Sequence, residues 1–152
     1  MSRTHQAEAV GIRQMRPDEA GSCEAILRAL PDWFGLESSI VQYRRDLEEM
    51  DTYVADFDGT VVGFLTLVQH NSYTAEIHVI AVDPRYHRHG LGRALVAHTE
   101  QILAQRAISY LEVKTLGPSR PDEFYGRTHA FYIAMGFCPV EENKLWARII
   151  LV

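Results

Sequence analysis

The segment from residue 74 to residue 116 constrains the fold more than any other part of the chain. TAEIHVIAV (74–82) has apolar residues on both faces, as does a strand in the centre of a covered sheet. A helix is expected from Gly90 to about Ala104, and ISYLEVKTL (108–116) follows as a second strand. Strands joined through a helix run parallel with a right-handed crossover, so this segment predicts a sheet covered by helices.

The other segments extend this alternation of strand and helix patterns. Asp58-Gly59, between two apolar runs, predicts a hairpin turn. The resulting order is β-α-α-β-β-β-α-β-α-β-β in a mixed sheet, within one domain of residues 1–152. The remaining elements are a strand at 9–16, a helix opened by Pro17 and Asp18 that runs through Leu30, a helix at 37–49, strands at 52–57 and 61–68, a loop at 117–126, a helix at 127–135, and strands at 137–140 and 144–152.

Composition narrows the class of protein. The chain has 152 residues, 47% of them hydrophobic and 23% charged, as in an ordinary globular domain. A net charge of −5 disfavours a general nucleic-acid binder. The longest apolar runs fall short of the ~20 residues that span a bilayer, so we expect a cytoplasmic protein without a membrane partner. Cys23 and Cys138 form no CxxC pair and are expected to be buried, reduced thiols.

VDPRYHRHGLGRAL (82–95) carries the strongest chemical signal. Pro84 ends the preceding strand, and the helix that begins near Gly90 leaves its first N–H groups unpaired. Arg85, Arg88 and Arg93 add positive charge. Together these features predict an anion site, most simply for a pyrophosphate. Neither the GxxxxGK[ST] pattern nor the third glycine of a dinucleotide fingerprint is present.

This stretch also resembles a known motif. IAVDPRYHRHGLGRAL is similar to the acetyl-CoA motif of the GNAT superfamily of N-acetyltransferases, V-x-P-x-[YW]-[RQ]-x-x-G-x-[GA]. His87 stands where the family usually has Arg or Gln. THAFYIAMGF (128–137) resembles a late segment of the same family, which ends in FY-x-x-x-GF. The motif positions that match are Val82, Pro84, Tyr86, Gly90 and Gly92.

The resemblance implies a fold, a co-substrate and binding residues. The fold would be a mostly antiparallel sheet of six to seven strands with a splayed parallel pair, covered by about four helices. The co-substrate would be acetyl-CoA, with no metal, and the acceptor an amine of a small molecule or peptide. By position, the CoA contacts would be backbone groups of Ile80, Ala81 and Val82, the turn residues His87, Arg88, His89, Gly90, Leu91, Gly92 and Arg93, and more weakly Thr128 and Phe131.

Two residues are candidates for proton transfer. Glu76 lies in an otherwise apolar strand, where burial makes a carboxylate more basic, and the family often has an acidic base there. The alternative is a Glu hydrogen-bonded to backbone or to an Arg. Tyr132 is the candidate acid, because a phenol pKa of ~10 lies just above the ~8.5 of a thiol. The alternative for Tyr132 is a packing tyrosine.

Weaker candidates surround this pair. His78 shares the Glu76 face of its strand, either as a proton relay or as a core histidine. Trp33 is the first candidate for the acceptor pocket. His78, His87 and His89 match no zinc spacing, which disfavours a metal site. The acidic run Asp46, Glu48, Glu49 and Asp51 is interpreted as a solvated helix end or as a flank for a cationic substrate.

A second class of function stays open. The same fold without catalysis would be an acyl-CoA-binding regulatory or interaction domain. The presence of both Glu76 and Tyr132 favours the enzyme. The sequence also permits a homodimer, on analogy of fold alone.

Overall fold

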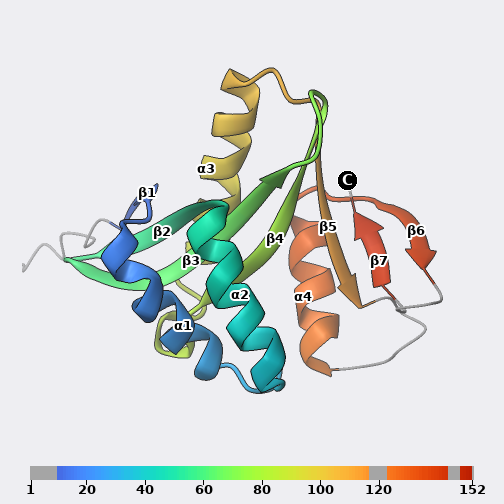
Figure 1. Ribbon diagram of the computed structural model, residues 1–152. Coiled ribbons are helices and arrows are strands. Elements are labelled where there is room, and N and C mark those ends of the chain that lie inside the picture. The colour runs from blue at the N-terminus through green and yellow to red at the C-terminus, as the bar shows by residue number, and fades with distance from the viewer. Residues whose placement is uncertain (1–9, 117–122, 144–147, 152) are drawn as a thin grey trace, which may run out of the picture.

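The computed structural model describes residues 10–116, 123–143 and 148–151. The predicted order of strands and helices is confirmed (Figure 1). The elements are β1 (Gly11–Gln14), a 3-10 turn (Pro17–Glu19), α1 (Ala20–Arg28), α2 (Glu37–Glu49), β2 (Asp51–Phe57), β3 (Thr60–Gln69), β4 (Thr74–Val82), a 3-10 turn (Pro84–Tyr86), α3 (Leu91–Gln105), β5 (Tyr110–Leu116), α4 (Glu123–Ala134), β6 (Pro139–Asn143) and β7 (Arg148–Leu151).

The described strands form one seven-stranded sheet in the order β1-β2-β3-β4-β5-β7-β6. All neighbours pair antiparallel except β4 and β5, which are parallel. This confirms the predicted mixed sheet with its single parallel pair. The pair is parallel because α3 carries the chain back to the starting end of the sheet before β5 begins.

Helices cover both faces of the sheet. Leu27 of α1 and Leu47 of α2 are fully buried with Phe64 in one core cluster. Leu95 of α3 and Tyr132 of α4 belong to a second cluster. Figure 1 accordingly shows α1 and α2 side by side in front of β2 to β4, whereas α3 passes behind them. Continuous burial from Val62 to Leu67 follows from a strand covered on both sides.

The β2–β3 hairpin has the backbone that its turn residues predict. Asp58 and Gly59 both adopt positive φ angles, 49° and 84°. Asp and Gly tolerate this left-handed region, and it gives a turn whose twist matches the flanking strands. The Gly59 N–H also donates to Asp56 Oδ1 at 2.7 Å.

A β-bulge in β4 separates the paired part of the strand from the part that leaves β5. Thr66 of β3 pairs with Val79, whereas Leu67 pairs with Ile77, so His78 is an extra residue on β4. The parallel pairing with β5 stops at Ile77 opposite Val113. A bulge bends its strand, which explains why β4 and β5 splay apart from this point. The predicted splay is therefore confirmed.

Some predicted boundaries and burials are wrong. Helix α4 begins at Glu123 within the predicted loop 117–126, because an acidic first turn and the Glu123–Arg127 pair at 2.8 Å favour a helix start. Residues 117–122 and 144–147 lie outside the described residues. Cys138 is exposed, whereas Cys23 is buried as predicted, and burial raises the pKa of its thiol to about 12. Helix α1 ends at Arg28 instead of Leu30, and β5 begins at Tyr110 instead of residue 108.

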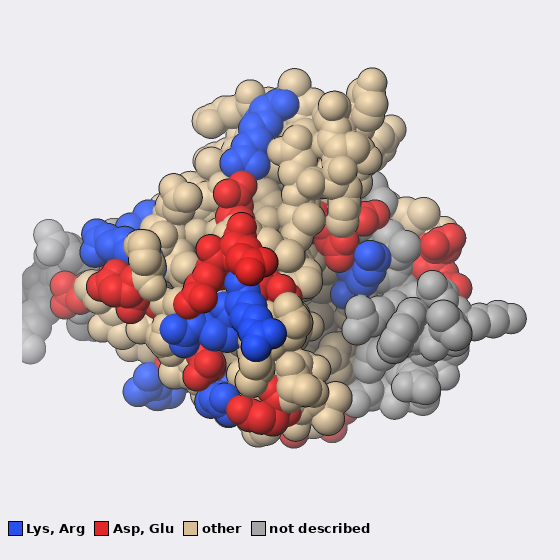
Figure 2. All heavy atoms as spheres, in the orientation of Figure 1, with Lys and Arg blue, Asp and Glu red and all other residues tan. Residues whose placement is uncertain are grey.

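Charges of both signs are interspersed over the face formed by α1 and α2 (Figure 2). Arg28 pairs with Glu37 at 2.6 Å and Arg44 with Glu48 at 3.1 Å. No helix among the described residues is long and apolar enough to cross a membrane.

Candidate active site

A cleft of about 880 Å³ opens where β4 and β5 diverge. Its walls come from β4, the turn after β4, the start of α3, β5, α4 and the loop between α1 and α2. Beyond Ile77 the edge of β4 has no β5 partner, so alternate residues present backbone groups to the cleft. Fifteen of the sixteen sequence-predicted site residues line the cleft: Trp33, Glu76, His78, Ile80, Ala81, Val82, His87, Arg88, Gly90, Leu91, Gly92, Arg93, Thr128, Phe131 and Tyr132.

The remaining predicted residue, His89, is exposed and is not part of the cleft wall.

Glu76 and His78 both face the α2 side of the sheet. Glu76 is 8% exposed, and its Oε1 accepts hydrogen bonds from His70 Nε2 at 2.7 Å and Lys114 Nζ at 3.3 Å. Among the described residues no partner contacts its second oxygen, Oε2. The carboxylate is therefore held through one oxygen while the other stays available to a molecule in the cleft. The predicted alternative of an Arg partner is not what the structure shows.

Lys114, His70 and Glu112 were not identified from the sequence. Glu112 lies directly opposite Glu76 in the parallel register, and Lys114 is two residues further along β5 on the same face. Period-2 alternation within β5 would have found both once the register was known. One ligand atom each from His70, Glu76 and Glu112 lies within 4.8 Å of the others, a spacing that a divalent cation accepts. In this structure the Lys114 ammonium supplies positive charge beside Glu76.

Tyr132 reaches the cleft from the opposite face of the sheet. Its ring packs edge-on against Phe131 and Phe137, with centroid distances of 5.3 and 5.4 Å. Only 3% of the residue is exposed, and burial raises the pKa of the phenol above its ordinary value. Its hydroxyl has no hydrogen-bond partner among the described residues. The phenol of Tyr132 on the cleft wall is therefore protonated, and its hydroxyl donates no hydrogen bond to any described residue.

The turn between β4 and α3 has the backbone expected of an anion cradle. Gly90 caps the helix with a φ of 74°, and Arg88 is also left-handed with a φ of 66°. Successive turns of this kind point N–H groups into a concavity, next to the positive end of the α3 dipole. Gly92, which lines the cleft, also has a packing role. A Cβ there would lie 3.3 Å from Phe131 Cζ, so the missing side chain lets α3 pack closely on α4.

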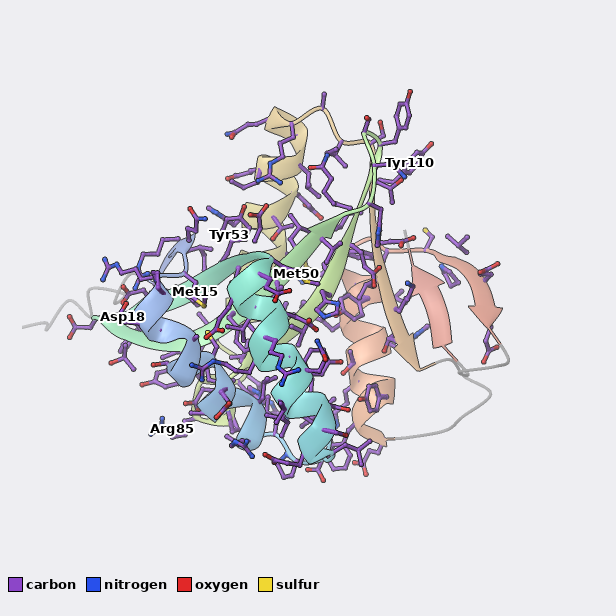
Figure 3. The ribbon with its side chains drawn as sticks, in the orientation of Figure 1. Met15, Asp18, Met50, Tyr53, Arg85 and Tyr110 are labelled. Carbon is purple, nitrogen blue, oxygen red and sulfur yellow. The ribbon has the colours of Figure 1, made fainter. Side chains whose placement is uncertain are left out.

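The side chains of the turn are divided between the cleft and the surface. His87 Nε2 lies 2.8 Å from the Val82 carbonyl oxygen, so the imidazole braces the turn against the end of β4. Arg88 and Arg93 line the cleft. Arg85 instead pairs with Asp83 at 2.8 Å and projects from the outer edge of the molecule below α1 (Figure 3). Two of the three arginines are therefore placed to attract an anion.

Trp33 links the α1–α2 loop to α4 across the cleft. Its Nε1 donates to Thr128 Oγ1 at 3.1 Å, and the Tyr125 hydroxyl donates to the Trp33 carbonyl at 2.9 Å. The indole also packs edge-on against Phe124, with a centroid distance of 5.0 Å. Trp33, predicted for the acceptor pocket, and Thr128, predicted for a CoA contact, are therefore joined by a hydrogen bond.

His78 is a partnered histidine on the cleft wall. Its Nε2 lies 2.8 Å from Asp46 Oδ2, and its ring is 5.6 Å from that of Tyr43. Asp46 is only 8% exposed, so the interpretation of this residue as part of a solvated helix end is wrong. The reason is helical spacing: Asp46 follows Tyr43 by three positions and shares its sheet-facing side. Glu48 and Glu49 are exposed as predicted.

Comparison with known proteins shows to which family the chain belongs. The profile of the acetyltransferase (GNAT) family matches residues 22–137. The chain therefore belongs to the GNAT acetyltransferase family, which confirms the resemblance found in the two sequence motifs.

Individual relatives agree with this assignment. An uncharacterized N-acetyltransferase of Chlorobaculum tepidum is 27% identical over 144 residues, covering 92% of this chain and 78% of the relative. A GNAT-family acetyltransferase structure from Desulfovibrio desulfuricans superposes with a TM-score of 0.84 at 21% identity, covering 94% of this chain and 97% of the other. The PaiA N-acetyltransferase of Thermoplasma acidophilum, solved with coenzyme A, gives a TM-score of 0.77 at 18% identity, covering 94% and 97%.

Proposed function

We propose that the protein is an N-acetyltransferase that moves the acetyl group of acetyl-CoA directly to an amine of a small molecule or peptide. The observation that carries the proposal is the splay of β4 from β5 beside a glycine-containing helix start. The free edge of β4 can pair with the amide groups of a pantetheine arm as a strand partner would. The turn at Arg88 to Gly90 and the start of α3 suit the pyrophosphate. Coenzyme A is bound in the PaiA relative, which supports the same ligand here.

The two candidate proton-transfer groups suit this reaction from opposite walls. An alkylammonium, with a pKa of ~10.4, must lose a proton before it attacks a thioester. Glu76 Oε2 is the available acceptor, directly or through a water. Charge then develops on the departing sulfur. Because burial raises the phenol pKa of Tyr132, we assign it as a hydrogen-bond donor to the thiolate more than as a full proton donor.

Thr115 gives independent support for a ligand in this cleft. Its hydroxyl oxygen is buried without a hydrogen-bond partner among the described residues, and the residue lines the cleft. Buried polar groups in folded proteins are nearly always paired, so an unpaired one on a cleft wall suits a group that a ligand satisfies.

Two measurements test the proposal. Calorimetric titration with CoA and with acetyl-CoA should show binding at one site per chain. An assay of thiol release with polyamines, aminoglycosides, amino acids and peptides should then find an acceptor, and Glu76→Gln should slow turnover more than it weakens CoA binding. Absence of CoA binding would refute the proposal. Tight binding without transfer to any amine would favour the non-catalytic acyl-CoA-binding domain.

A further inference from the structure

The chain is unusually poor in the one side chain that an N-acetyltransferase can modify. Of its 15 basic residues only two are lysines, Lys114 and Lys144, and the rest are arginines. An arginine stays protonated and cannot act as the acceptor amine, whereas a lysine can once it is deprotonated. Lys144 lies outside the described residues. Lys114 lies in the candidate active site.

Lys114 already meets the geometric condition for an acceptor amine. An acceptor must bring its nitrogen within hydrogen-bond reach of the base, directly or through one water. Lys114 Nζ lies 3.3 Å from Glu76 Oε1, and the residue lines the cleft. Its side chain is 40% exposed, and its flexible four-carbon stem lets the ammonium leave Glu76 and turn toward other parts of the cleft.

We propose that Lys114 is a site of self-acetylation by acetyl-CoA bound in the cleft. The inference rests on the proposed function and concerns the same site. Glu76 accepts one proton from the Lys114 ammonium and passes it to solvent. The neutral Nζ attacks the thioester carbonyl carbon, a C–N bond forms and the C–S bond breaks. The second proton leaves the nitrogen for the sulfur, so the products are an amide on Lys114 and free CoA thiol.

Tethering makes this reaction compete well with transfer to a free amine. Because Lys114 is part of the cleft wall, transfer to it needs no second molecule to bind, and well-oriented intramolecular reactions reach effective molarities of about 10⁵ M or more. Acetylation also removes the positive charge of Lys114. Three carboxylates then remain: Glu76 on the cleft wall, Glu112 opposite it on β5, and Asp46 next to His78, and their charge strengthens the attraction of the cleft for a cationic acceptor. The modification would thus act as a regulator of acceptor binding.

The experiment incubates the purified full-length chain with acetyl-CoA and no added amine. Intact mass and peptide mapping follow the acetyl group over time, while calorimetry on the same preparation records CoA binding. We expect Lys114 to approach one acetyl group per chain and to be labelled at least about tenfold faster than Lys144. Lys144→Arg should leave the labelling unchanged, Lys114→Arg should abolish it while keeping the charge, and Glu76→Gln should slow it.

The outcomes separate this inference from the proposed function. If the protein releases thiol with an external amine but Lys114 stays unlabelled, self-acetylation is overturned and the proposed function stands. Equal labelling of Lys114 and Lys144 would indicate uncatalysed chemistry and would also overturn it. If CoA does not bind, the proposed function fails first.

Discussion

The hydroxyl of Tyr132 offers a sharp separation of catalysis from stability. Tyr132→Phe removes one oxygen and keeps the ring that packs against Phe131 and Phe137. Because the hydroxyl has no partner among the described residues, its loss breaks no hydrogen bond there. We therefore expect the free energy of unfolding to change by less than about 0.5 kcal/mol.

The expected loss of rate follows from the bond that the hydroxyl would make in the transition state. A hydrogen bond from a neutral donor to a charged acceptor contributes about 1.5–3 kcal/mol. Each ~1.4 kcal/mol corresponds to tenfold in rate, so kcat should fall about 10- to 100-fold. KM for acetyl-CoA should change little, since the charge on sulfur is absent in the ground state.

The pH dependence gives a second measurement on the same pair of proteins. Burial raises the phenol pKa above its ordinary ~10, so the hydroxyl stays protonated at every pH below that value. The ratio of wild-type to mutant kcat should therefore stay constant from about pH 6 to pH 9. Tyr53→Phe, at a second buried tyrosine that lies outside the cleft wall, is the matched control and should keep normal turnover.

Thiol release at saturating acetyl-CoA and acceptor, together with urea unfolding, supplies these values. A kcat within threefold of wild type would remove Tyr132 from the reaction. Parallel losses of kcat and stability would assign the residue to packing instead. A ratio that falls toward one below pH 9 would contradict the raised pKa.

Three further predictions concern stability and are tested by urea unfolding. Trp33→Phe and Thr128→Val should show a coupling energy of about 1 kcal/mol in a double-mutant cycle, because both remove the same 3.1 Å hydrogen bond. A coupling energy near zero would mean that this hydrogen bond does not stabilise the fold. Glu19 has its pKa lowered from 4.5 to about 2, chiefly by an arginine hydrogen bond. Glu19→Gln should therefore lower the free energy of unfolding by about 2 kcal/mol at pH 7, after allowance for solvent screening. This difference should disappear as the pH falls from about 4.5 to about 2. A loss of stability that does not depend on pH would contradict the linkage between the pKa of Glu19 and folding. Gly90→Ala should destabilise by about 1 kcal/mol at its left-handed φ, whereas Gly126→Ala within α4 should stabilise; equal effects would refute the strain argument.

The sequence predicts those features that local chemistry determines. Asp58-Gly59 specifies its turn, and the apolar run of β4 specifies a buried strand. The left-handed Gly90 is likewise a local requirement of the helix start. The conformation at these positions depends on only a few neighbouring residues, which is why the element order could be predicted without knowledge of the tertiary structure.

Contacts between strands are harder to predict because they depend on register. Lys114 approaches Glu76 only because Glu112 lies opposite Glu76 in the β4–β5 pairing. Likewise, Asp46 looked like part of a solvated helix end until α2 placed it against His78. A shift of one residue in the β4–β5 register would exchange the faces of the strand and separate Lys114 from Glu76.

The bulge at His78 links the fold of the sheet to the proposed function, because it changes which residues of β4 face each side of the sheet. Before it, Ala75 and Ile77 belong to the core cluster beneath α3 and α4; after it, Val79 and Ala81 belong to the cluster beneath α1 and α2. Without the extra residue, β4 could continue in register beside β5, and its edge would be closed by the sheet's own hydrogen bonds. The bulge thus opens the edge that the proposed co-substrate needs, and it lies two residues after Glu76. The proposed base, Glu76, and the last residue of β4 that pairs with β5, Ile77, are therefore neighbours in the chain.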